Sequence, residues 1–292
     1  MAAALLFAAC NNRIAPSTTP VVNTEIINEK KQATLLGRCS YNILESENYK
    51  EWFTKSFSNY KVDTNTALQL KPLLAGKTIE IFLGTWCGDS RREVPAMLKV
   101  LETAGCDTNT IKLIFVHNAD SVYKQSPQHE EKGKFVHHVP TFILYEGNKE
   151  LNRILETPIV SLEKDLLAVL NKTDYAPKYK ALLAWKKEKH KTKLMGNERL
   201  NTLVAKYKNL CLHAGEFNAY GYVLMSNKKM TEALNVFKLN VLLYNNNANI
   251  WDSLAECYYK MGNKAEAKKY YEKVLELNPK SENAKMMLEK LR

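Results

Sequence analysis

The chain has 292 residues, of which 45% are hydrophobic, and it carries a formal net charge of +11. This length allows two domains of ordinary size, and the apolar content excludes an intrinsically disordered chain. The positive charge is spread over lysines along the sequence, and no motif combines basic with aromatic residues, so nucleic acid is not expected as a partner. The six cysteines are too few and too dispersed for a disulfide scaffold.

The first ten residues, MAAALLFAAC, form a short apolar run that ends in two small residues and a cysteine. Nine apolar residues are too few to span a bilayer. The stretch resembles the signal peptide and lipobox (residues 1–10) of a bacterial lipoprotein, which implies cleavage before Cys10 and lipidation of that residue. We therefore expect a lipid anchor at the cell envelope, on the periplasmic side. An ordinary N-terminal tail is the alternative.

Residues 11–34 are mostly polar, contain two prolines and predict a flexible tether. A first domain is expected over residues 35–172, where helical and strand patterns alternate. Helices are predicted at 48–60, 65–74, 91–105 and 161–172, and strands at 78–84, 111–120 and, as a hairpin turning at Gly147 and Asn148, 140–156. This order predicts an α/β sandwich with a mixed sheet.

Three motifs in this domain occur in a fixed order. TWCGDS (residues 85–90) lies at a predicted junction of strand and helix, Pro95 follows Cys87 by eight residues, and VPTFILY spans residues 139–145. Together they resemble the thioredoxin family, and the resemblance covers most of the domain. It implies a thioredoxin-like fold, a cis peptide bond at Pro140, and Cys87 as the nucleophile.

The sequence departs from the family at two places. Ser90 replaces the second cysteine of the active-site turn, and Ile81 stands where the family has a buried acid that assists that second cysteine. A lone thiolate can attack a disulfide, but another thiol must release the product. Isomerisation or capture of polypeptide disulfides therefore fits better than net reduction, and Cys39 or Cys106 remains a possible resolving thiol.

The start of a helix favours the thiolate form of a cysteine, because unpaired backbone N–H groups and the helix dipole point toward it. Arg91 and Arg92 add positive charge near Cys87, whereas Asp89 opposes them. The Ser90 hydroxyl can donate a hydrogen bond to the sulfur. Cys87 and Ser90 are thus the predicted catalytic pair.

Trp86 is expected to cover the thiol, and Val139 with Pro140 to bind substrate by offering backbone groups to an extended peptide. His137 and His138 directly precede these residues, and we expect one histidine to tune the thiolate and the other to face solvent. A metal site would need three or four ligands, so neither a metal nor another cofactor is expected.

Residues 173–215 are rich in lysine and predict a basic helical linker between two domains. A solvated helix face explains this charge, and contact with a membrane surface is the alternative.

A repeat fills most of residues 216–292. A shift of 34 positions pairs Phe217 with Trp251 and Gly221 with Ala255, which is the tetratricopeptide pattern of small and aromatic positions. Residues 282–291 predict a capping helix. The residues predicted to bind a partner protein are Phe217, Leu224, Trp251 and Tyr258. A short stack that only extends the fold is the alternative.

The sequence thus predicts an α/β thioredoxin-like sandwich followed by an all-α tetratricopeptide-repeat domain. The predicted function is thiol–disulfide exchange on protein or peptide substrates at the cell envelope, with a partner protein at the repeats. A redox-inactive binding scaffold is the rival hypothesis.

Overall fold

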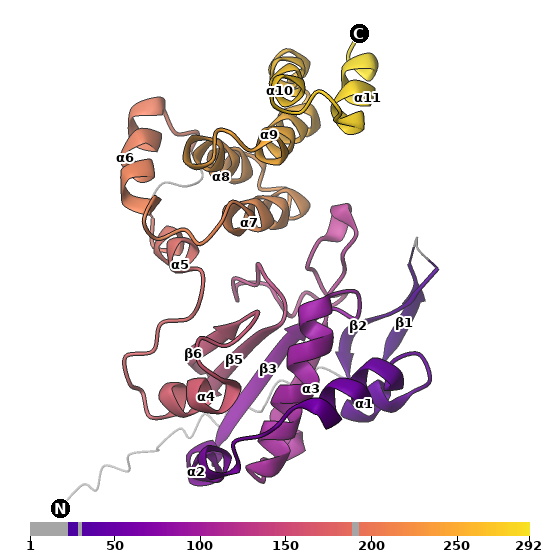
Figure 1. Cartoon of the computed structure of the whole chain (residues 1–292), viewed down its shortest axis with the longest axis vertical. Coiled ribbons are helices and arrows are strands. Elements are labelled where there is room, and N and C mark those ends of the chain that lie inside the picture. The colour runs from indigo at the N-terminus through magenta and orange to yellow at the C-terminus, as the bar shows by residue number, and fades with distance from the viewer. Residues whose placement is uncertain (1–22, 29–30, 189–192) are drawn as a thin grey trace, which may run out of the picture.

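The computed structural model describes residues 23–28, 31–188 and 193–292. An N-terminal α/β domain is followed by a helical module, which lies across one end of the sheet (Figure 1). The predicted signal peptide with Cys10, and most of the predicted tether, fall outside the described residues. Among the helices that the structure describes, none is long and apolar enough to cross a membrane.

Six strands form one mixed sheet in the order β1-β2-β4-β3-β5-β6. Strands β3 and β4 pair in parallel, and the remaining pairs are antiparallel. The strands are β1 (Thr24–Ile27), β2 (Ala33–Cys39), β3 (Lys77–Leu83), β4 (Ile111–Phe115), β5 (Thr141–Glu146) and β6 (Lys149–Leu155). The predicted mixed sheet is therefore confirmed.

Strand β1 corrects the predicted tether of residues 11–34. Thr24 to Ile27 pair antiparallel with Leu36 to Ala33, so the sheet begins inside the segment that was expected to be flexible. Each side chain of β1 is at least partly exposed. Its sequence therefore carries no run of buried residues, and the strand is defined by pairing with β2 instead.

Four α-helices and a 3-10 turn contribute to the main core on one face of the sheet. Alternation along β3 sends Ile79, Ile81 and Leu83 into this core and Phe82 to the opposite face. The elements are η1 (Tyr41–Glu45), α1 (Lys50–Asn59), α2 (Thr64–Leu74), α3 (Gly88–Thr103) and α4 (Leu162–Leu170). The positions of the four α-helices agree with the predicted helices, whereas η1 was not predicted.

The opposite face of the sheet carries a smaller apolar cluster. Phe82 packs there with residues of β4 and β5, and Val136 and Val139 join it from the segment that leads into β5. No described α-helix contributes a buried side chain to this cluster. The irregular segment 116–140, with the 3-10 turn η3 (Asp120–Val122), therefore forms this side of the domain.

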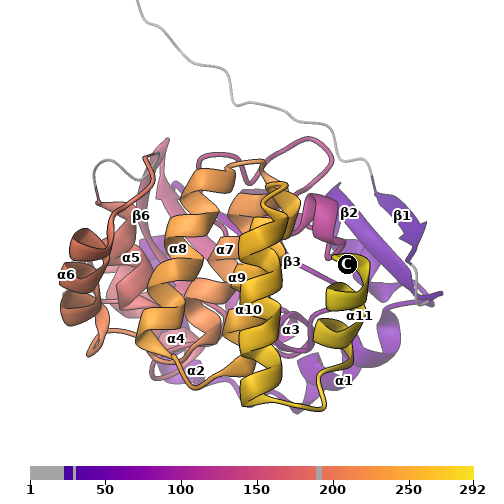
Figure 2. The same ribbon diagram turned by 90° about the horizontal axis from the view of Figure 1, so that it is seen from above.

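The described residues of the helical module form seven helices. Figure 2 shows the module from above, in front of the α/β domain. The helices are α5 (Lys180–Lys186), α6 (Asn197–Tyr207), α7 (Gly215–Ser226), α8 (Met230–Leu243), α9 (Ala248–Lys260), α10 (Lys264–Leu277) and α11 (Glu282–Lys290). The predicted basic linker of residues 173–215 is corrected here. Its described residues form two helices, but Trp185 and Tyr207 of these helices are buried in the module core, so the segment is part of the module and not a free linker.

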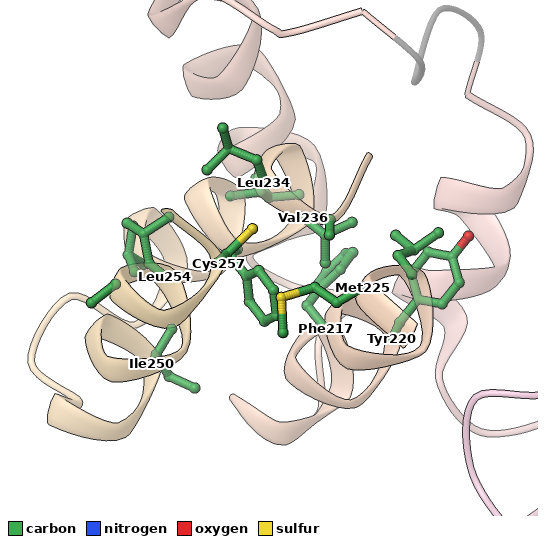
Figure 3. Packing of buried hydrophobic residues seen from close by; sticks show 14 of the residues in the cluster. Phe217, Tyr220, Met225, Leu234, Val236, Ile250, Leu254 and Cys257 are labelled. Atoms are coloured by element: carbon green, nitrogen blue, oxygen red, sulfur yellow. The ribbon is translucent and has the colours of Figure 1, made fainter. Parts of the chain in front are cut away.

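Buried hydrophobic side chains of α7, α8 and α9 form part of the module core (Figure 3). A Cβ atom added to Gly221 would lie 2.4 Å from Cε1 of Phe237, so α7 and α8 can approach this closely only with glycine at that position. In the second hairpin, Ala255 and Ala267 are fully buried. The small positions predicted from the repeat are thus buried in the module core, and Gly221 allows a close approach of two helices.

Candidate functional site

Cys87 lies at the junction of β3 and α3, where it is the N-cap residue of the helix. Its N–H donates to the carbonyl of Gly84 over 3.0 Å, which closes the turn after the strand. A side chain at Gly84 would collide with the Trp86 ring, since an added Cβ would lie 2.4 Å from it. The turn thus fixes a partly exposed thiol at the start of a 16-residue helix.

The thiol and its indole neighbour are both bound to backbone carbonyls. Cys87 Sγ donates to the Val139 carbonyl over 3.3 Å, and Trp86 Nε1 donates to the Val116 carbonyl over 2.9 Å. Both side chains pack against the cluster that contains Val139. Trp86 therefore lies beside Cys87, as expected of a residue that covers the thiol.

Ser90 does not act as predicted. Its Oγ accepts a hydrogen bond from the N–H of Gly84 at 3.3 Å, and the side chain is buried, with no hydrogen bond to Cys87 among those of the described residues. The closed turn draws the hydroxyl toward the backbone of the strand end. Ser90 thus stabilises the turn that carries the thiol.

The two arginines expected to add positive charge are occupied by other groups. Arg91 Nε donates to the Thr85 carbonyl. Arg92 forms ion pairs with Asp89 at 2.6 Å and with Glu93 at 2.7 Å. The charge of Arg92 is therefore largely balanced by its own helix.

The peptide bond between Val139 and Pro140 is cis, as the family resemblance implied. Both residues are buried, however, and the Val139 carbonyl already accepts from Cys87. The predicted ledge for a substrate peptide is therefore covered in this structure.

Both histidines before the cis bond are buried, which corrects the expectation that one faces solvent. Their Nδ1 atoms are 2.6 Å apart, and the His138 ring stacks on Tyr179 with centroids 4.0 Å apart. Burial lowers the pKa of both imidazoles well below the usual value, so both are neutral near pH 7. The described residues contain no cluster of three or more potential metal ligands.

Lys124 is a site residue that the sequence did not single out. It is 4% exposed, its Nζ donates to the His137 carbonyl over 2.6 Å, and it lies 4.5 Å above the Tyr123 ring. Burial lowers its pKa to about 8, while electrostatic interactions with Cys87 and Glu156 act in the opposite direction. A lysine in a polar loop usually faces water, so no sequence pattern could have identified it.

Helix α7 of the module packs on the segment that holds Lys124. Ser226 Oγ donates to the Tyr123 carbonyl and accepts from Gln125 Nε2, each over 3.2 Å. The rings of Tyr123 and Tyr222 form an edge-to-face pair with centroids 6.4 Å apart. The residues on either side of Lys124 are thus tied to the module.

The other thiols lie away from this site. Cys39 is buried in the core on the other face of the sheet. Cys106 follows the far end of α3, about 24 Å from its start for a helix of this length. It lines a cavity of about 690 Å³ between η1, α1 and α3. Neither cysteine is placed to resolve a disulfide at Cys87.

Burial also raises the pKa of these thiols and of the two in the module. The pKa reaches about 12 for Cys39, Cys211 and Cys257, and that of Cys106 is raised as well. All four therefore remain protonated near neutral pH.

The residues predicted to bind a partner are mostly part of the module core. Phe217, Leu224 and Tyr258 are buried, so their side chains are not available to a partner in this structure. Trp251 is half-buried: its Nε1 donates to the Asn245 carbonyl over 2.6 Å, and its ring stacks on Tyr270. The aromatic repeat positions thus hold helices together.

Comparison with known families identifies one segment. A tetratricopeptide repeat model matches residues 248–281, which include α9 and α10. No curated protein matches the chain. The fold is therefore a mixed-sheet α/β domain joined to helical hairpins of the tetratricopeptide type. The chain carries a tetratricopeptide repeat, and this supports binding of a protein partner.

Proposed function

We propose that this chain is a thiol–disulfide exchange protein of the cell envelope, with a thioredoxin-like α/β domain and one reactive thiol, Cys87. The observation that carries the proposal is the position of this thiol at the start of α3, partly exposed and 3.3 Å from the carbonyl that precedes a cis-proline. The tetratricopeptide module would dock a partner protein, and a lipid on Cys10 would hold the chain at the membrane.

The chemistry starts with the Cys87 thiolate. It attacks one sulfur of a substrate disulfide, so a bond forms between Cys87 and that sulfur while the substrate bond breaks and releases its second sulfur as a thiolate. Ser90 cannot expel the bound substrate. A thiolate from the substrate or from a small thiol must therefore attack the mixed disulfide and regenerate Cys87. When the attacking thiolate belongs to the substrate, a new disulfide forms within it and its number of disulfides is unchanged, which is the stoichiometry of isomerisation. When the thiolate belongs to a small thiol, the product is a mixed disulfide between substrate and small thiol.

A binding scaffold without redox chemistry is the second candidate function. The burial of Val139 and Pro140 favours it, because a substrate peptide would have to displace the covering groups before pairing with this backbone. In that case the module would still recruit a partner, and Cys87 would serve only to hold the segment before β5.

The exchange rate of a disulfide-linked model peptide with glutathione decides between these functions. We expect the full-length protein to accelerate exchange and Cys87→Ser to reduce the rate to the background without protein. Cys106→Ser, which removes a partly exposed thiol at the far end of α3, is the matched control and should keep the wild-type rate. Equal rates for wild type and Cys87→Ser would leave only the scaffold.

A further inference from the structure

Two side chains from different parts of the α/β domain bind the same short backbone segment. Cys87 Sγ donates to the carbonyl of Val139, and Lys124 Nζ donates to the carbonyl of His137, two residues earlier. The thiol and the ammonium group are thus bound to carbonyls two residues apart in one buried segment. Lys124 is buried, so water screens its charge poorly.

The backbone of Lys124 is held as firmly as its side chain. Its N–H donates to the His117 carbonyl over 2.8 Å, and the His117 N–H donates to the Gln125 carbonyl over 2.9 Å. Ser226 of α7 is bonded to the two neighbours of Lys124, Tyr123 and Gln125. The position of the ammonium group therefore depends on contacts from both the α/β domain and the module, which meet at this segment (Figure 1).

We propose that Lys124 is a positioning residue whose buried ammonium group stabilises the thiolate of Cys87, and that helix α7 holds it in place. This inference rests on the proposed exchange at Cys87. Lys124 then supplies the positive charge near Cys87 that was expected from the arginines of α3. The module also has a second role, because packing of α7 then tunes the thiol.

The ionisable groups around Lys124 are consistent with this role. Electrostatic interactions with Cys87 and Glu156 raise the pKa of Lys124, against the effect of burial. His137 is held neutral by burial and by the positive charge of Lys124. Burial raises the pKa of Tyr123 to about 12, so this phenol is neutral too. The Lys124 side chain is positively charged below about pH 8 and neutral above it, so it can stabilise the Cys87 thiolate at neutral pH.

The test is the pH dependence of Cys87 alkylation by iodoacetamide in the full-length protein, followed on the peptide that contains Cys87. Lys124→Met should move the half-maximal rate upward by roughly one pH unit, which lowers the rate about tenfold at neutral pH. Lys124→Gln keeps a donor for the His137 carbonyl and should shift the curve equally, whereas Lys124→Arg keeps the charge and should stay near the wild type. Ser226→Ala should shift it in the same direction by less.

Lys186→Met is the matched control, because it removes a lysine that lies over the nearby Phe135 ring and interacts electrostatically with Arg153 and Glu150. An unchanged curve in folded Lys124→Met or Lys124→Gln, or an equal shift in Lys186→Met, would overturn the inference. If Lys124→Met does not fold, Lys124→Gln and Lys124→Arg decide. A shifted curve in Lys124→Met, in a protein that shows no exchange activity, would refute the proposed function but keep the interaction of Lys124 with Cys87. Exchange activity together with an unchanged curve would refute that interaction alone.

Discussion

The two helical hairpins of the module share one 34-residue pattern but meet different surroundings. In the first hairpin, Tyr222 packs on Tyr123, and Ser226 bonds to the segment around Lys124. Their counterparts in the second hairpin are Glu256, which accepts from the Tyr222 hydroxyl, and Lys260, which pairs with Glu256 at 2.7 Å.

The comparison shows that the positions that pack helices together are distinct from those that contact the α/β domain. Both hairpins keep the small positions that allow their helices to approach, because these positions face inward. The first hairpin has specialised its outer positions for the α/β domain. The second remains closer to the repeat consensus, in line with the family match at residues 248–281. Repeats can therefore diverge in their contacts while their packing is retained.

The largest effect should come from the closest helix contact of the first hairpin. Gly221→Val would place a branched side chain where a single Cβ already lies 2.4 Å from Phe237, a buried ring that cannot move away. We expect a loss of about 3 kcal/mol in the free energy of unfolding. Ala255→Gly at the matching position should cost only about 1 kcal/mol through backbone entropy. Urea denaturation measures both values, and a smaller loss for Gly221→Val than for Ala255→Gly would contradict the equivalence of the two positions.

The next effect concerns the segment of the α/β domain that leads into β5. His137 and His138 of this segment are buried and neutral near Tyr220 of the first hairpin and Tyr179, whereas the second hairpin, residues 248–281, contains no histidine. The unfolded chain takes up protons on these imidazoles below about pH 6.5, and the folded chain does not, so stability falls as the pH decreases. We expect a loss of about 2 kcal/mol between pH 7.5 and 5.5.

Denaturant midpoints at the two pH values provide the measurement. His138→Gln should remove about half of this pH dependence, because it removes one of the two buried imidazoles. Stability that is constant over this range would show that the histidine pair is not buried as described.

The smallest effect concerns the polar contact between the two parts of the chain. Ser226→Ala removes two hydrogen bonds to the segment around Lys124, and we expect a loss of about 1 kcal/mol. Lys260→Ala, at the corresponding position of the second hairpin, breaks only an exposed pair within one helix and should cost less than about 0.5 kcal/mol. Equal losses in thermal or urea unfolding would mean that the first hairpin is not docked through Ser226.

Much of the fold could be predicted from sequence because its elements have buried faces. The apolar run from Ile79 to Leu83 predicts a buried strand, and the periodic pattern of α3 predicts a helix. Strand β1 could not be predicted in this way, because only its pairing with β2 defines it. The two helices after residue 180 were not predicted as part of the module core. Lysine dominates the composition of this segment, and only a few of its residues, such as Trp185, are buried.

The candidate site was predicted in part. Cys87, Trp86 and the cis bond before Pro140 follow from local motifs, because the turn and the segment that they form are short. The partner of the Ser90 hydroxyl and the burial of Lys124 depend on how distant segments meet. Contacts between distant segments cannot be predicted from composition, so Lys124 is recognised as a site residue only in the structure.

The central claim is that Cys87 is the reactive thiol of the chain, and the first mixed disulfide formed in the exchange assay tests it most directly. The native protein would be exposed briefly to glutathione disulfide near pH 7, quenched with acid, and mapped by mass spectrometry. The account predicts that the glutathione adduct appears on Cys87 before it appears on Cys106 or Cys211, whose thiols stay protonated. An adduct that forms on either of those residues first, or none on Cys87, would contradict it.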